Sequence, residues 1–228
     1  MTDEITTTTN EEEQDGSHLL KVFASPERYV QGPNAMKYLG NEMKKLNMKG
    51  PVLVVSSETP RTLLEEIWRS SLKENGYDEI YYHSFGGICS DHESKRIVAA
   101  AEAIDAKTLI GIGGGQVIDS VRTASIKIPT PCEVVSCPTI ASTDAPCSTL
   151  CVLYHENEQT GNKEFHEYRF TKRHPTLVLV DTTVIANAPR RLLVGGLGGT
   201  YIYIYIYLCV CVCLISCSTY NIEYVRDF

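Results

Sequence analysis

Three consecutive glycines near the middle of the chain are the first residues whose type and spacing suggest chemistry. Gly113, Gly114 and Gly115 follow an apolar stretch and precede Gln116, which opens a helix-like pattern. Glycine lets a ligand approach the backbone closely, and free N–H groups at a helix N-terminus bind phosphate. The G-x-G-x-x-G dinucleotide pattern is incomplete, because Gln116 stands where its last glycine would be. The run therefore favours a phosphate site, with a tight turn that binds nothing as the alternative.

Hydroxyl and carboxylate side chains form a second cluster after the next apolar stretch. Its members are Thr139, Ser142, Thr143, Asp144 and Ser148. Polar groups at the carboxyl end of a strand face the ligand in open α/β sheets. The same residue types ahead of a proline also cap helices, and taken alone these residues favour capping.

The elements that would position both clusters alternate between strand and helix. Apolar runs predict strands at residues 52–56, 79–85, 107–115, 132–139 and from 176, and amphipathic patterns predict helices at 59–76, 91–106 and 115–127. Thr59 and Asp91 are the expected N-caps of the first two helices. Residues 151–170 predict a hairpin with its loop at 156–163, and a short helix is expected around Pro189. The alternation predicts an α/β fold, a Rossmann-like parallel sheet with helices on both faces.

Composition excludes some classes of protein. The net charge is −7, and most of it lies in an acidic segment, residues 1–17, which we expect to be a disordered tail. The remainder is close to neutral, so it offers no basic face to a nucleic acid. The cysteines form no CxxC pair and the histidines no HxxxH or HExxH spacing, which predicts reduced thiols and no local zinc site. No secretory or mitochondrial leader is evident, so we expect a cytoplasmic protein.

The order of five motifs resembles a known family. FASPERYVQG, FGGICSDHE, IGIGGGQVIDS, PTIASTDAPCSTLCVLY and RHPTLVLVDTTVIANAPRRLLVGGLG occur in sequence between about Val22 and Gly198. This order is similar to that of the iron-containing (group III) alcohol dehydrogenases, and in particular of the glycerol dehydrogenases among them. The resemblance implies an N-terminal NAD-binding domain, here residues 18–198, followed by an all-helical domain. It also implies zinc or iron and a polyol substrate in the cleft between them, within a homo-oligomer.

The resemblance assigns roles to individual residues. It implies that Gly114 and Gly115 hold the NAD pyrophosphate, with Gln116 and Asp119 beside it. It implies that NAD contacts Thr139, Ser142, Ser148, Leu150 and Tyr154, and that Asp144 faces the glycerol. Ser57 stands at the position expected to bind the adenosine ribose.

Three positions depart from the family pattern. Gln116 replaces a lysine, which removes a cation near the cofactor. Ser57, with Glu58 adjacent, replaces the carboxylate that binds the ribose hydroxyls. Gly199 replaces the aspartate that is the first metal ligand of the family, so we expect no metal ligand set in this chain.

A segment of alternating residues follows, GGTYIYIYIYLCVCVCLIS, within residues 199–228. Tyr-Ile and Cys-Val repeats are what alternating T–A and T–G tracts encode, so our hypothesis is that an unspliced intron or a misjoined gene supplies this tail. A strand without a polar face and a membrane anchor are the alternatives, both less favoured. We therefore expect an NAD-dependent glycerol dehydrogenase domain without activity of its own, or else a non-enzymatic NAD-binding fragment, tethered to a membrane if the anchor is real.

Overall fold

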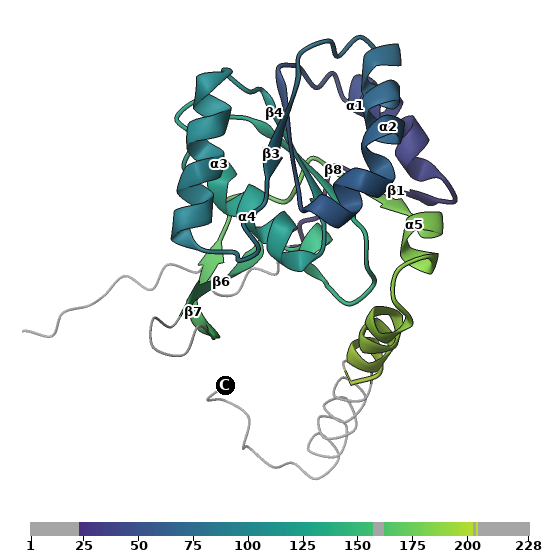
Figure 1. Ribbon diagram of the computed structural model, residues 1–228, viewed down its shortest axis with the longest axis vertical. Coiled ribbons are helices and arrows are strands. Elements are labelled where there is room, and N and C mark those ends of the chain that lie inside the picture. The colour runs from purple at the N-terminus through teal and green to yellow at the C-terminus, as the bar shows by residue number, and fades with distance from the viewer. Residues whose placement is uncertain (1–22, 157–161, 203, 205–228) are drawn as a thin grey trace, which may run out of the picture.

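The computed structural model describes residues 23–156, 162–202 and 204, and the predicted tails lie largely outside this range. A six-stranded parallel sheet has the order β1-β8-β5-β4-β2-β3 (Figure 1). Its strands are β1 (Arg28–Gly32), β2 (Val52–Ser56), β3 (Ile80–Ser84), β4 (Thr108–Gly113), β5 (Glu133–Pro138) and β8 (Leu177–Asp181). The helices are η2 (Ala35–Tyr38), α1 (Leu39–Lys45), α2 (Glu58–Glu74), α3 (Asp91–Ala103), α4 (Gly115–Ser125), η3 (Ala145–Cys147) and α5 (Thr182–Ala186). The predicted α/β fold class is confirmed.

Helices cover both faces of the sheet, which explains why its central strands are apolar throughout. Val52 and Val54 of β2 pack on one face together with Trp68, which lies in α2 and is fully buried. Leu53 and Val55 point to the opposite face and pack with residues of α3 and α4. Successive strand residues alternate between the two faces, so a strand buried on both sides needs apolar residues at every position.

The direction of winding reverses between β2 and β4. The chain leaves β2 for β3 at one edge of the sheet, whereas it leaves β4 for β5 and moves toward the other edge. β2 and β4 are neighbours, paired in parallel from Val52 with Thr108 to Ser56 with Ile112. Such a reversal opens a crevice at the carboxyl ends of the strands, where open α/β sheets bind their ligands.

A separate antiparallel hairpin forms from β6 (Leu150–Glu156) and β7 (Lys163–Phe170). The predicted hairpin is therefore confirmed, although most of its loop, residues 157–161, lies outside the described residues. β6 packs against α4, so the hairpin lies beside the helix that follows the glycine turn.

Both predicted N-caps were wrong. α2 begins after Ser57 and α3 after Ser90. Ser90 Oγ accepts a hydrogen bond from the Glu93 backbone N–H (3.2 Å), the arrangement expected of an S-x-x-E capping box. Serine at this position satisfies an amide that Asp91, one residue later, cannot reach.

Two helices flank Pro189 where one was expected. α5 ends at Ala186, before the proline, and residues 190–202 are helical after it. The first residues of the alternating tail, Tyr201 and Ile202, belong to this helix, so the strand alternative is wrong for them. In the described residues no helix combines the length and the apolar character that crossing a bilayer requires.

Asp181 joins three elements at the end of β8. It is 3% exposed, and its Oδ1 accepts hydrogen bonds from the backbone N–H groups of Asn34 and Thr183 (both 3.0 Å). Its Oδ2 accepts from the N–H of Met36 (2.9 Å). One carboxylate thus caps α5 and fixes the turn between β1 and η2.

Replacing Asp181 with alanine should lower the free energy of unfolding by about 3 kcal/mol, because the N–H groups of Asn34, Met36 and Thr183 lose their acceptor and that of Met36 is buried. Urea denaturation followed by circular dichroism measures this loss. The exposed Asp78 provides the control, and Asp78→Ala should change stability by less than about 0.5 kcal/mol. Equal losses in the two variants would contradict this role for Asp181.

Candidate functional site

A cavity of about 320 Å³ lies between α4, the loop after β5 and the hairpin. It is lined by Gly115, Gln116, Asp119, Ser142, Thr143, Asp144, Ala145, Ser148, Leu150, Val152 and Tyr154. Nine of these residues were singled out from the sequence, and they come from three separate segments of the chain. The structure thus brings together the glycine turn and the polar cluster, while their binding roles stay predictions.

The glycine turn brings the start of α4 against the loop after β5. β4 ends at Gly113, and α4 begins at Gly115 with Gly114 as its N-cap. A Cβ atom added at Gly115 would lie 2.6 Å from Thr143 Oγ1, closer than real atoms approach. The first-turn amides of a helix have no acceptor within the helix, so this end of α4 can bind an anion.

Gln116 holds a neighbouring loop. Its side-chain Oε1 accepts a hydrogen bond from the backbone N–H of Cys89 (3.3 Å), in the loop between β3 and α3. Gln116, the second residue of α4, therefore links this helix to the β3–α3 loop at the carboxyl edge of the sheet.

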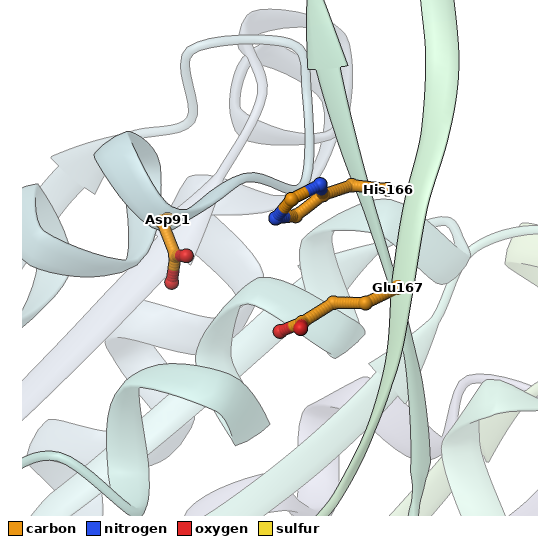
Figure 2. Close-up of side chains that lie close together, drawn as sticks. All are labelled: Asp91, His166 and Glu167. Carbon is orange, nitrogen blue, oxygen red and sulfur yellow. The ribbon is translucent and has the colours of Figure 1, made fainter.

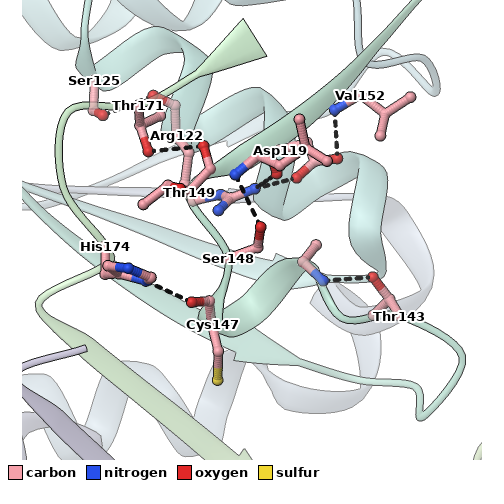
Figure 3. A network of polar contacts seen from close by, with 12 residues as sticks. Asp119, Arg122, Ser125, Thr143, Cys147, Ser148, Thr149, Val152, Thr171 and His174 are labelled. Atoms are coloured by element: carbon pink, nitrogen blue, oxygen red, sulfur yellow. Dashed lines mark hydrogen bonds and ion pairs between the residues drawn. The ribbon is translucent and has the colours of Figure 1, made fainter. Parts of the chain in front are cut away.

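Asp119, which lines the cavity, forms a buried ion pair with Arg122, which does not (Figure 3). Asp119 Oδ1 lies 2.6 Å from Arg122 Nη2, and Asp119 Oδ2 accepts from the backbone N–H of Val152 (3.1 Å). Arg122 also donates to the carbonyl oxygen of Leu150. Burial raises the pKa of Asp119, and the Arg122 charge opposes that shift. Both carboxylate oxygens are engaged by the protein, so Asp119 positions β6 more directly than it contacts a ligand.

The polar loop is held by short-range hydrogen bonds. Ser148 Oγ accepts from the N–H of Leu150 (2.8 Å), and Thr143 Oγ1 accepts from the N–H of Ala145 (3.2 Å). Because the Ser148 oxygen is the acceptor, its hydroxyl proton is available to a ligand. Asp144 lines the same cavity and is exposed.

Three predicted residues do not line this cavity. Gly114 is the N-cap of α4, and Thr139 extends the pairing of β4 and β5 through its N–H, which donates to Gly113 O (3.0 Å). Ser57 follows β2, the neighbour of β4 on the side away from β5. These residues lie outside the cavity, at the carboxyl ends of β2, β4 and β5. The candidate site therefore includes the place where the winding reverses, between β2 and β4.

The helix at residues 190–202 contacts the loop that carries Ser142. A Cβ atom at Gly196 would lie 2.5 Å from the carbonyl oxygen of Ala141, so the helix backbone packs directly on the loop. Gly199 lies further along this helix, with nothing within 4 Å of its Cβ position. It has no side chain to coordinate a metal, so the described residues do not fit the metal site that the resemblance implies.

One cluster elsewhere has the composition of a metal site. The ligand atoms of Asp91, His166 and Glu167 lie within 4.8 Å of one another (Figure 2). However, Asp91 Oδ1 lies 2.6 Å from Lys127 Nζ and 2.7 Å from Arg169 Nη1, and Arg169 also pairs with Glu167. Basic side chains already neutralise both carboxylates. We therefore interpret the cluster as an ion-pair network that joins α3 to β7.

Three residues at the site were not predicted: Ala145 and Val152, which line the cavity, and Arg122, which pairs with Asp119. Val152 lies between Leu150 and Tyr154, and all three line the cavity, as alternation along a strand would have indicated. Arg122 stands three residues after Asp119, the spacing at which side chains meet on a helix. No local pattern in the sequence indicated that β6 would donate a hydrogen bond to Asp119 and accept one from Arg122.

The chain is similar to enzymes of one family. The model of the family described as "Iron-containing alcohol dehydrogenase" matches residues 26–182. A glycerol dehydrogenase of Thermotoga maritima is 40% identical over 173 residues, which is 76% of this chain and 44% of that protein. A glycolaldehyde reductase of Halobacterium salinarum is 37% identical over 179 residues, 78% of this chain and 46% of that protein.

Solved structures show the same relation. The crystal structure of glycerol dehydrogenase from Schizosaccharomyces pombe matches with a TM-score of 0.68 and 31% identity, covering 78% of this chain and 43% of that one. The chain therefore spans less than half of the length of these relatives.

The Asp91 network should make the fold sensitive to acid. Hydrogen bonds from Arg169 and Lys127 hold the pKa of Asp91 well below its ordinary value. A depressed pKa stabilises the fold above the unfolded-state pKa of about 4, and this contribution is lost as the pH falls toward the folded-state pKa. Between about pH 5 and pH 2, the wild-type protein should lose more stability than Asp91→Asn.

Urea denaturation at a series of pH values measures this difference. Asp105→Asn serves as the control, because Asp105 is exposed and pairs only with Lys107. Parallel pH profiles for Asp91→Asn and the wild type would show that the network contributes nothing.

Proposed function

The chain belongs to the iron-containing alcohol dehydrogenase family, and from this premise we propose that its described domain binds NAD along the carboxyl edge of the parallel sheet. The observation that carries the proposal is the glycine turn at the start of α4. Gly115 keeps the helix N-terminus free of side chains, and the turn lies beside the reversal of the sheet, where dinucleotides bind in such folds.

The NAD pyrophosphate would be held by the amides that open α4. The helix dipole and the free N–H groups both favour a negative group there. The adenosine ribose would lie toward Ser57 at the end of β2. The nicotinamide would enter the cavity between α4 and the hairpin, where Leu150, Val152 and Tyr154 form one wall.

The substrate would be a polyol, with glycerol as the candidate because several relatives are named glycerol dehydrogenases. NAD, when bound, accepts a hydride from the carbon that bears the alcohol. Asp144 is the exposed carboxylate of the cavity and would accept a hydrogen bond from a substrate hydroxyl. The Ser148 hydroxyl would donate to a ligand oxygen, and the apolar residues of β6 would exclude water.

The metal of the family has no ligand at Gly199, and we derive no step from it. We propose that a chain with glycine at this position binds NAD without oxidising glycerol at an ordinary enzymatic rate. The glycine therefore favours the second candidate function, a non-enzymatic NAD-binding module, over glycerol oxidation. Formation of NADH from NAD and glycerol by the purified chain at an ordinary rate would instead support the dehydrogenase.

Gly115→Ala should weaken NAD binding about tenfold, because the added Cβ displaces either Thr143 or the start of α4. Isothermal titration calorimetry with NAD measures the change. Gly198→Ala is the matched control, since Gly198 is also helical and has nothing within 4 Å of its Cβ position. Equal affinity of the two variants would argue against binding at the turn.

Ser57→Asp should tighten NAD binding about tenfold, because a carboxylate accepts both ribose hydroxyls more strongly than serine does. The affinity for NADP should not rise, since its 2′-phosphate would meet the new negative charge. Glu58→Gln tests whether the adjacent carboxylate already performs this role. A loss of NAD affinity in Glu58→Gln, with no gain in Ser57→Asp, would assign the ribose to Glu58.

A further inference from the structure

A second cavity, of about 180 Å³, lies at the amino ends of the strands, whereas the glycine turn lies at their carboxyl ends. Its walls come from the end of α4 around Ser125, the start of β5 around Cys132, and the segment 171–176 that precedes β8. The volume is several times the roughly 30 Å³ that a water molecule occupies in the liquid. The cavity is therefore large enough for a small polyatomic ion.

The charged side chains that line this cavity are all basic. They are Arg122, Lys172 and Arg173, with His174 beside them. Lys172 and Arg173 are exposed, and neither forms an ion pair within the described part of the chain. Glu133, which follows Cys132 in the chain, accepts a hydrogen bond from Thr176 and does not line the cavity.

Arg122 reaches this cavity from the protein interior. The residue is 1% exposed, and only its Nη2 makes hydrogen bonds, with Asp119 and with Leu150 O. Its Nε and Nη1 are buried and have no partner among the described residues. Arg122 lines this second cavity and not the one proposed for NAD. A buried guanidinium N–H without an acceptor is costly, so the positive charge of Arg122 is incompletely balanced beside this cavity.

We propose that this cavity binds a small oxyanion, for which inorganic phosphate is the simplest probe, through Lys172 and Arg173, beside the buried charge of Arg122. A tetrahedral oxyanion supplies acceptors for the two exposed cations and balances part of the Arg122 charge. The same guanidinium holds Asp119 and Leu150 in the wall of the NAD cavity (Figure 3). One side chain therefore links the two cavities, although the oxyanion site does not depend on NAD binding.

Isothermal titration calorimetry of the full chain with phosphate, at an ionic strength kept constant with sodium chloride, tests the proposal. We expect saturable binding at one site, weakened about tenfold in Lys172→Gln and in Arg173→Gln because each loses a charge-assisted contact. Lys95→Gln and Arg190→Gln are the matched controls, because both residues are exposed and lie outside the cavity. They should bind phosphate as the wild type does.

Phosphate could also bind at the glycine turn, so Gly115→Ala separates the two sites. If Gly115→Ala loses phosphate binding while Arg173→Gln binds phosphate as the wild type does, the oxyanion site is overturned and the ion binds at the turn. Absence of saturable binding in the wild type would also overturn it. Phosphate binding that depends on Arg173, in a protein that does not bind NAD, would support this site while refuting the proposed function.

Discussion

The buried pair of Asp119 and Arg122 holds strand β6 of the hairpin against α4. The two side chains bind Val152 and Leu150 of β6, and in the described part of the chain no strand pairing joins the two sheets. A buried ion pair overcomes its desolvation cost only when its remaining donors and acceptors are also satisfied. Here the Val152 N–H donates to the second oxygen of Asp119, and the carbonyl oxygen of Leu150 accepts from Arg122. One wall of the cavity proposed for NAD is therefore built by the same interaction that stabilises the buried charges.

The rest of the candidate site follows from the winding of the sheet. Because β2 and β4 leave the sheet in opposite directions, their carboxyl ends are adjacent and uncovered. Ser57 lies at one of these ends and the glycine turn at the other, with the hairpin beyond it. An elongated ligand with a phosphate near its middle matches this arrangement, whereas a compact ligand would use only one part of it.

The sequence predicted what depends on local pattern. The strands of the parallel sheet other than β1 are runs of apolar residues, and α2, α3 and α4 show helical spacing, so these elements could be recognised from neighbours along the chain. β1 was missed because Arg28–Gly32 lies at an edge and contains one strongly apolar residue, Val30. The predicted caps failed by one or two residues, because the start of a helix depends on the conformation of the preceding residue.

The sequence predicted most residues of the candidate site, but not the hydrogen bonds that join them to other elements. The glycine turn and the polar cluster were identified, and the resemblance brought in Leu150 and Tyr154. The links made by Asp119, Arg122 and Gln116 depend on backbone groups more than twenty residues away, which no local spacing encodes. Their roles became visible only from the packing of α4 against β6 and the β3–α3 loop.

The burial of Trp68 gives the protein an internal optical probe. It is the only tryptophan of the chain, and it lies in the core between α2 and the sheet, on the face opposite α3 and α4. Its fluorescence should therefore be shifted to short wavelengths in the native state and should move to longer wavelengths when that core opens. A ligand bound beside α4 would leave the emission spectrum nearly unchanged, so intrinsic fluorescence can follow the integrity of the fold independently of occupancy.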